Sequence, residues 1–95
     1  MRDFAKHRGL PTAMMMLAAA LVPSAAQAQA SCDWYAKTAL EQQKVNLDRK
    51  CGFKGEAWSS DRVSHMNWCR DVTPARWKEQ AQKREQQLEK CLAGK

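Results

Sequence analysis

Four cysteines and one histidine carry the most specific chemistry of the chain beyond its N-terminal stretch. The cysteines are Cys32, Cys51, Cys69 and Cys91. All of them follow a basic and then apolar stretch of the kind that directs export, and exported thiols pair into disulfides in oxidising compartments. We therefore expect two structural disulfides rather than a thiolate centre.

Dithiol redox catalysis would need a Cys-x-x-Cys arrangement with one activated thiolate. The closest cysteines in the sequence, Cys51 and Cys69, lie eighteen positions apart. The serines near His65 carry no nucleophile-elbow motif, so hydrolytic chemistry is not indicated either. We expect no enzymatic activity and no bound cofactor.

His65 is the remaining candidate ligand. It precedes Cys69 by four positions, which places both side chains on one face of a helix, a spacing that two zinc ligands can share. A single histidine makes a poor metal site once the thiols are oxidised. We expect a half-buried, hydrogen-bonded His65 beside a disulfide, with metal or haem binding as the alternative.

The N-terminal stretch has the composition of a cleavable signal peptide. Arg2, Lys6 and Arg8 form a positive start, and an uncharged run rich in alanine, methionine and leucine follows over 12–22. That run is well short of the roughly twenty residues that span a bilayer, so we expect no transmembrane segment.

Two cleavage positions fit this leader equally well, after Ala28 and after Ala30. We predict a signal peptide over residues 1–28 and one small domain over residues 29–95, periplasmic or secreted. Cys32 lies where a lipoprotein would carry its lipid, but the polar glutamine three positions earlier argues against lipidation.

Three helices are expected to position these residues, and the first runs over 34–50. Ser31 and Asp33 provide its start, and Gly52 is placed for the left-handed residue that follows a helix. Phe53 would then fold back onto the last turn.

The second helix is expected to begin with Ser59 or Ser60 as its cap and Asp61 in its first turn, and to end near Asp71. Spacing three or four apart gives it one inward side. That side comprises Arg62, His65, Cys69 and Val72.

The third helix is expected over 75–92, after Thr73 as its cap and Pro74 as its first residue. Its inward line is Trp77, Ala81, Arg84, Leu88 and Cys91. This seam contains a single charged residue, so the Arg84 side chain should pair with a partner or reach out to solvent.

Short connections favour antiparallel neighbours, so the expected fold is all-α, an up-down-up arrangement of three helices. Cys32 and Cys51 then lie at opposite ends of one helix, too far apart to bond. The favoured disulfides are Cys32–Cys69 and Cys51–Cys91, and the alternative is Cys32–Cys91 with Cys51–Cys69. These bridges matter because a core this small contributes little net stability.

Four tryptophans supply much of the expected core, since each ring buries a large apolar area. They cannot all point inward in so small a bundle. An exposed aromatic ring beside arginine has the composition of an interaction hot spot. We expect such a patch at Trp68 with Arg62 or Arg70.

Several of these residues also form a spaced pattern along the chain. It reads Cys32-x-x-Tyr35-Ala36, Cys51-Gly52-Phe53-x-Gly55-x-x-Trp58, His65-x-x-Trp68-Cys69, and then Arg84, Leu88 and Cys91. The pattern resembles a small four-cysteine helical module, without a known activity, in proteins exported by Gram-negative bacteria. The resemblance implies an exported helical module and supplies no catalytic or binding residue.

The formal net charge is +6 for the whole chain and +4 for residues 29–95, which contain 13 basic and 9 acidic residues, and these charges are interspersed along the expected helices, which is typical of a solvated surface. We expect no nucleic-acid partner. The predicted function is a non-enzymatic module with a protein-interaction or structural role in the cell envelope, bound to an unidentified envelope protein or polymer. The alternatives are metal or haem binding through His65, and a cationic protein that binds anionic envelope polymers.

Overall fold

The computed structural model describes residues 25–95, and this part of the chain is all-α, as predicted. Its elements are α2 (Ala25–Asp48), the short 3-10 helix η2 (Glu56–Trp58), α3 (Arg62–Asp71) and α4 (Pro74–Ala93). Most of the predicted leader, residues 1–24, lies outside the described residues.

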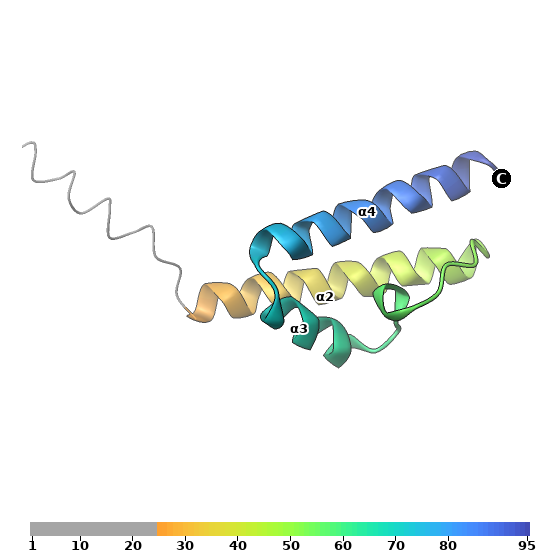
Figure 1. Cartoon of the computed structure of the whole chain (residues 1–95). Coiled ribbons are helices and arrows are strands. Elements are labelled where there is room, and N and C mark those ends of the chain that lie inside the picture. The colour runs from red at the N-terminus through yellow and green to blue at the C-terminus, as the bar shows by residue number, and fades with distance from the viewer. Residues whose placement is uncertain (1–24) are drawn as a thin grey trace, which may run out of the picture.

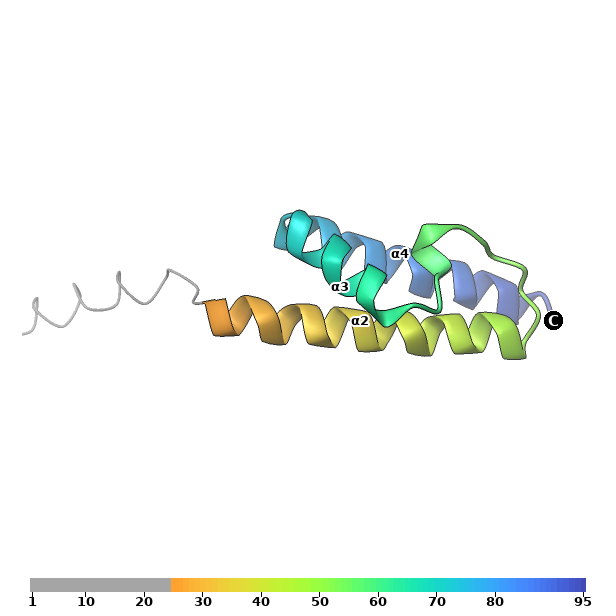
Figure 2. The ribbon, with the colours of Figure 1, turned by 90° about the horizontal axis from the view of Figure 1, so that it is seen from below.

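Helix α2 is the element on which the others pack. It contacts α3, α4 and η2 (Figure 1). The chain leaves α2 at its C-terminal end, returns through η2 and α3, and runs along α2 again as α4, as Figures 1 and 2 both show. The predicted up-down-up arrangement is therefore confirmed.

The predicted start of the first helix at Ser31 and Asp33 is wrong. Helix α2 begins at Ala25 and passes through both residues without a break. The additional turns consist of alanine and glutamine, which are strong helix formers and need no break at Ser31. Asp33 instead accepts a hydrogen bond from the Arg62 guanidinium at 3.1 Å and so links α2 to α3.

Helix α2 ends in a Schellman motif, and its left-handed residue is Lys50 rather than the predicted Gly52. Lys50 has a φ of 54°, its N–H donates to the Leu47 carbonyl, and the Cys51 N–H donates to the Asn46 carbonyl. These two bonds satisfy carbonyls that the end of the helix would leave unpaired. Gly52, with a φ of 82°, then turns the chain once more.

The side chain of Asn46 holds the segment after α2 in place. Its amide donates to the Phe53 carbonyl at 2.9 Å and accepts from the Phe53 N–H at 3.0 Å. The Phe53 ring stacks on Trp58, with centroids 4.8 Å apart, rather than covering the last turn of α2 as predicted. Leu47 in that turn consequently remains exposed.

Helix α3 is capped by Asp61, one or two residues later than predicted. The Asp61 carboxylate accepts from the Val63 N–H at 3.1 Å, while the Ser59 hydroxyl accepts from the Asp61 N–H. The predicted inner side is correct for His65 and Cys69, which are buried. Arg62 is the exception, since it lies on the exposed side of the helix.

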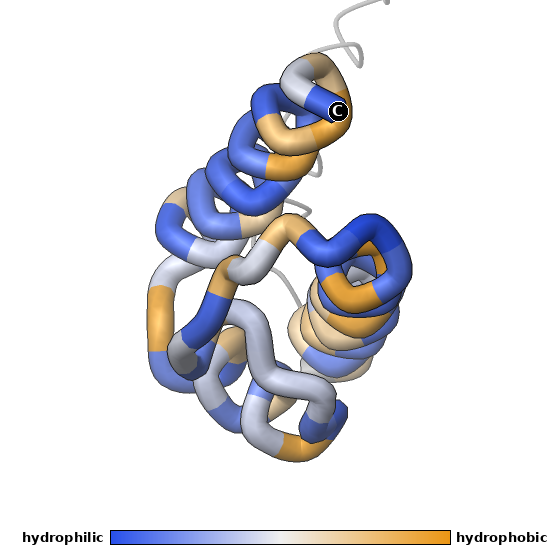
Figure 3. Tube along the Cα trace, turned by 90° about the vertical axis from the view of Figure 1, so that its right-hand side faces the viewer, coloured by the Kyte–Doolittle hydropathy of each residue, from blue (hydrophilic) through white to orange (hydrophobic). Residues whose placement is uncertain are grey.

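Helix α4 follows the prediction closely. Thr73 caps it, with its hydroxyl accepting from the Arg76 N–H, and Pro74 is the first helical residue. The predicted inward residues Trp77, Ala81, Arg84 and Leu88 are all buried. In the end-on view of Figure 3, the rest of α4 is predominantly hydrophilic.

The two disulfides are Cys32–Cys69 and Cys51–Cys91, which confirms the favoured pairing. Their Cα atoms lie 5.6 and 5.9 Å apart, within the normal range for a disulfide. The first bridge joins α2 to α3, and the second joins the segment just after α2 to the last turns of α4. The bundle is therefore cross-linked at both ends, through α3 at one end and through α4 at the other.

The main core cluster lies around the first disulfide. It consists of Cys32, Tyr35, Ala36, Met66, Cys69, Trp77 and Ala81, with Trp68 and Val72 packed against it. Among residues 25–95, none of the helices combines the length and the apolar character that a membrane span requires.

Removal of either disulfide should destabilise the domain markedly. Each bridge closes a loop, over separations of 37 and 40 residues, and the chain-entropy contribution for such loops is about 4 kcal/mol each. We expect the paired substitution Cys51→Ala with Cys91→Ala to lower the free energy of unfolding by about 3 kcal/mol. Urea denaturation followed by circular dichroism measures this loss.

The paired substitution Cys32→Ala with Cys69→Ala should cost more, because these two residues are buried in the core cluster whereas Cys51 and Cys91 are only half-buried. Their removal loses packing as well as the cross-link. Equal stability of the wild-type chain and both variants would contradict this account of the fold.

Candidate functional site

A charged side chain, Arg84, lies fully buried at the centre of the bundle. Its Nε donates to Gln42 Oε1 at 2.7 Å, and its Nη1 donates to the Tyr35 hydroxyl at 2.9 Å and to the Ala57 carbonyl at 3.2 Å. Nη2 has no hydrogen-bond partner among the described residues. The guanidinium thus joins α4 to α2 and to η2.

Arg84 has no direct carboxylate partner among the described residues, and Gln42 lies between it and Glu85. Gln42, also buried, accepts from Arg84 with its oxygen and donates with its nitrogen to the Ala81 carbonyl and to Glu85 Oε1 at 3.1 and 3.2 Å. The amide therefore lies with its negative end toward the cation and its positive end toward the carboxylate. This orientation follows from the chemistry of its neighbours, since the flipped amide would put two donors together.

Tyr35 is the aromatic centre of the domain. The Arg84 guanidinium lies over its ring, with the guanidinium carbon 5.0 Å from the centroid, a cation–π geometry. The rings of Trp68 and Trp77 lie 5.5 and 6.0 Å from the same centroid, and that of His65 at 6.1 Å. One buried ring therefore contacts α3 and α4 together.

His65 is buried beside Tyr35, and its Nε2 lies 2.8 Å from the Ser59 carbonyl oxygen. Because a carbonyl only accepts, Nε2 must carry the proton. Burial lowers the pKa of His65 from its ordinary value of 6.5; the hydrogen bond to Ser59 opposes this effect, the Arg84 charge adds to it, and Asp61 opposes it. The net effect favours the neutral form of His65.

The predicted pairing of His65 with Cys69 does not produce two ligands, because Cys69 is bonded to Cys32. Residues 25–95 contain no group of three side chains of the ligand types placed to hold a metal ion. His65 is hydrogen-bonded, as the sequence favoured, but it is buried rather than half-buried. A ligand role for it stays a prediction.

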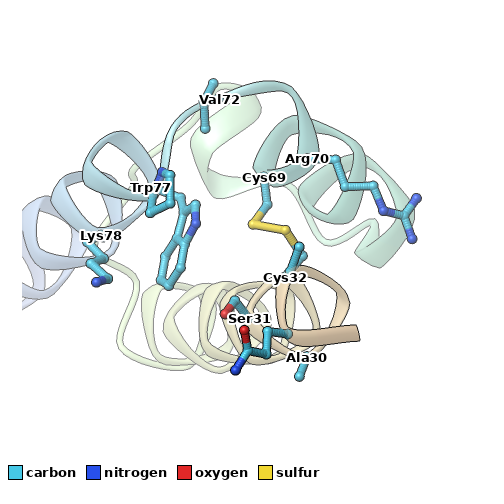
Figure 4. A pocket seen from close by; sticks show the side chains of 11 residues that line it. Ala30, Ser31, Cys32, Cys69, Arg70, Val72, Trp77 and Lys78 are labelled. Atoms are coloured by element: carbon cyan, nitrogen blue, oxygen red, sulfur yellow. A yellow bond between two sulfur atoms is a disulfide. The ribbon is translucent and has the colours of Figure 1, made fainter. Parts of the chain in front are cut away.

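A groove of about 700 Å³ lies at the Cys32–Cys69 end of the bundle (Figure 4), and we call it the end groove. It is lined by residues 27, 28 and 30–32 of α2 and by Cys69, Arg70, Val72, Pro74, Trp77 and Lys78. Helix α2 forms one wall, and the corner between α3 and α4 forms the other. Its volume is in the range of sites that hold small ligands or side chains.

The surface of the end groove is mostly apolar and is flanked by positive charge. In Figure 4 the indole of Trp77 lies on one side of the hollow and the disulfide on the other. Lys78 lies beyond Trp77, with its ammonium 5.7 Å from the indole centroid, and Arg70 extends away on the disulfide side. None of the lining residues is acidic.

The residues of the predicted patch, Trp68 with Arg62 or Arg70, have three different environments in the structure. Trp68 is partly buried against the core, and Arg62 is engaged by Asp33. Arg70 lines the end groove. Whether the three residues contact a partner stays a prediction.

Trp34 is the most exposed of the four tryptophans, with 53% of its surface accessible, and the sequence did not identify it as an interaction residue. Its ring centroid lies 5.9 Å from that of Trp77, a residue that lines the end groove. Only the register of α2 reveals this position: Trp34 precedes the buried Tyr35 and therefore faces away from it by about 100°.

A second hollow, of about 520 Å³, lies at the opposite end of the bundle, where α2 meets the segment that follows it. Its lining includes Lys50, Phe53, Lys54 and Trp58. Phe53 and Trp58 stack on each other there, so their rings are occupied by an internal contact. Because it also combines aromatic and lysine side chains, this hollow provides a control for binding experiments on the end groove.

Protein-family models, curated proteins and solved structures were compared with the chain, and none of them matches it. The resemblance to a four-cysteine exported module therefore stays a prediction. The candidate site depends on the geometry of the end groove and the buried network alone.

Replacing Arg84 should cost far more stability than replacing a neighbouring surface cation. Arg84→Met would leave the Tyr35 hydroxyl, the Gln42 oxygen and the Ala57 carbonyl without their donor, at an expected cost of about 2–4 kcal/mol. Lys83→Met, one residue earlier and exposed, is the matched control and should change stability by less than about 0.5 kcal/mol. Urea denaturation of both variants measures the difference, and equal costs would contradict a structural role for the guanidinium.

The free energy of unfolding should fall as the pH is lowered through about 6.5. The folded domain holds His65 neutral with a lowered pKa, so the unfolded chain takes up the proton first and is favoured by acid. The contribution of His65 to stability is complete above the pKa that the histidine has in the unfolded chain. It is lost as the pH falls from that value through the lower pKa of His65 in the folded domain.

His65→Gln keeps a donor for the Ser59 carbonyl and removes the titrating group. Its free energy of unfolding should change less than that of the wild type between pH 7 and about pH 5, where carboxylates begin to contribute. Urea denaturation at several pH values measures both profiles. Identical profiles for the two proteins would exclude His65 as the source of the acid sensitivity.

Proposed function

We propose that this chain is an exported, non-enzymatic module that binds a partner in the cell envelope through the end groove. The observation that carries the proposal is an apolar groove held in shape by a disulfide. The Cys32–Cys69 bridge both lines the groove and fixes α2 against α3. A surface fixed before binding loses little conformational entropy when a partner docks.

The proposed compartment is supported by the sequence and by the sulfur chemistry together. All four cysteines of the described residues are paired, and disulfides persist outside the reducing cytoplasm. The leader-like stretch precedes the first of them. Both proposed cleavage positions lie within α2, and cleavage at either leaves Ser31 and Cys32 as a wall of the groove.

The proposed interaction surface is supported by the aromatic residues around the groove. Trp77 forms part of its lining, and the exposed Trp34 packs against Trp77 at its edge. Tryptophan beside arginine and lysine is the composition that dominates binding energy in protein interfaces. The polar side chains of the buried network are meanwhile engaged with one another inside the bundle.

Site-specific photo-crosslinking in the producing cell tests this function. A photoreactive phenylalanine derivative replaces Trp34 beside the groove or, as matched controls, the exposed Val63 on α3 or the exposed Leu47 at the far end of α2. We expect a discrete crosslinked species from position 34 and none from the two controls. No crosslink from position 34, or equal crosslinks from all three positions, would contradict the proposal.

Mass spectrometry of the recovered protein, with and without reduction, tests the compartment in the same samples. We expect a mature chain that begins after Ala28 or Ala30 and contains no alkylatable thiol. An uncleaved chain with four free thiols would exclude export.

A further inference from the structure

The end groove combines two recognition elements in one place. Trp77, Val72 and Pro74 provide apolar surface next to the disulfide. Arg70 and Lys78 provide two cations on opposite sides of that surface (Figure 4). A ligand that fills the groove therefore meets apolar contacts at its centre and positive charge on both sides.

We propose that the end groove binds an acidic peptide segment anchored by an apolar side chain, which deepens the function proposed above and rests on it. The apolar side chain would insert between Trp77 and the disulfide. Acidic residues before and after it would then approach Arg70 and Lys78. Complementary charge at the rim of an interface mainly sets the rate of association and the choice of partner.

The placement of the two cations favours a peptide over a single-headed lipid. A fatty acid or a phospholipid carries its negative charge at one end, whereas these cations lie on two sides of the apolar surface. A peptide can place acidic residues on both sides of one apolar anchor. The lining contains no carboxylate that would repel such a segment.

The recognising residues do not depend on which cleavage position is used. Arg70, Val72, Trp77 and Lys78 all belong to the α3–α4 side of the groove, and Cys32 on α2 lies beyond both proposed positions. Cleavage would shorten the wall formed by α2 and open the groove at that end. The mature domain therefore loses part of the α2 wall and keeps the apolar surface of Val72, Pro74 and Trp77 with both cations.

The test uses the oxidised protein recovered after expression of the full chain and follows its amide resonances by NMR. The probe is a short capped peptide with leucine at its centre and glutamates on both sides. We expect shifts at Arg70, Val72 and Lys78, and none at Gly52 and Gly55 beside the opposite hollow. Matched peptides with glutamine for glutamate, or with serine for leucine, should bind at least about tenfold more weakly.

Charge reversal supplies the matched protein variants. Arg70→Glu with Lys78→Glu should weaken binding of the acidic peptide by at least about tenfold. Lys54→Glu with Lys83→Glu makes the same change in net charge at exposed positions outside the groove and should have little effect. Thermal melts confirm that both pairs remain folded.

Three results would overturn the proposal: no shift at the groove at the highest soluble peptide concentration, equal binding of the glutamate and glutamine peptides, or binding to phosphatidylglycerol vesicles in place of the peptide. If a partner crosslinks at position 34 equally well in the wild type and in the Arg70→Glu, Lys78→Glu variant, the proposal of an acidic segment is wrong and the proposed interaction function is unaffected. Absence of any crosslink from position 34 in the protein with Arg70 and Lys78 intact would overturn both.

Discussion

The structure depends on one buried cation. A guanidinium removed from water is costly unless hydrogen bonds compensate for the lost hydration. Arg84 donates to three neutral acceptors and lies over an aromatic ring, and only its Nη2 has no partner among the described residues. These partners come from α2 and η2, while the arginine itself belongs to α4. Helix positions that would leave the acceptors of Tyr35, Gln42 or Ala57 unpaired are therefore penalised, and the register of α4 against α2 is fixed.

The disulfides and the arginine constrain different parts of the same bundle. The two bridges hold the ends of the bundle, since Cys32–Cys69 joins α2 to α3 and Cys51–Cys91 joins the segment after α2 to the last turns of α4. Cross-links of this kind act largely by restricting the unfolded chain, whereas a buried hydrogen-bond network selects among compact states. A domain with so small an apolar core needs both, because the disulfides limit the unfolded chain and the hydrogen-bond network limits the alternative compact states.

Much of the fold could be predicted from the sequence because it follows from local rules. Thr73 with Pro74 specifies the start of a helix, and the positions of the cysteines near the ends of three antiparallel helices leave a favoured pairing. The errors arose where two local solutions compete. Both Lys50 and Gly52 adopt positive φ, but the two Schellman bonds close at Lys50 and Cys51, so α2 ends before the glycine is reached.

The candidate site was less accessible to sequence reasoning because it is made by three segments that meet in space. Arg70 was identified as an interaction residue, but with Trp68, which the structure packs against Tyr35. The spacing of apolar residues does not reveal that the corner between α3 and α4 lies against the first turns of α2. The Cys32–Cys69 bridge brings these segments together and so forms the groove. The bond that compensates for a small core is thus also the one that creates a binding surface, so reduction should remove stability and recognition together.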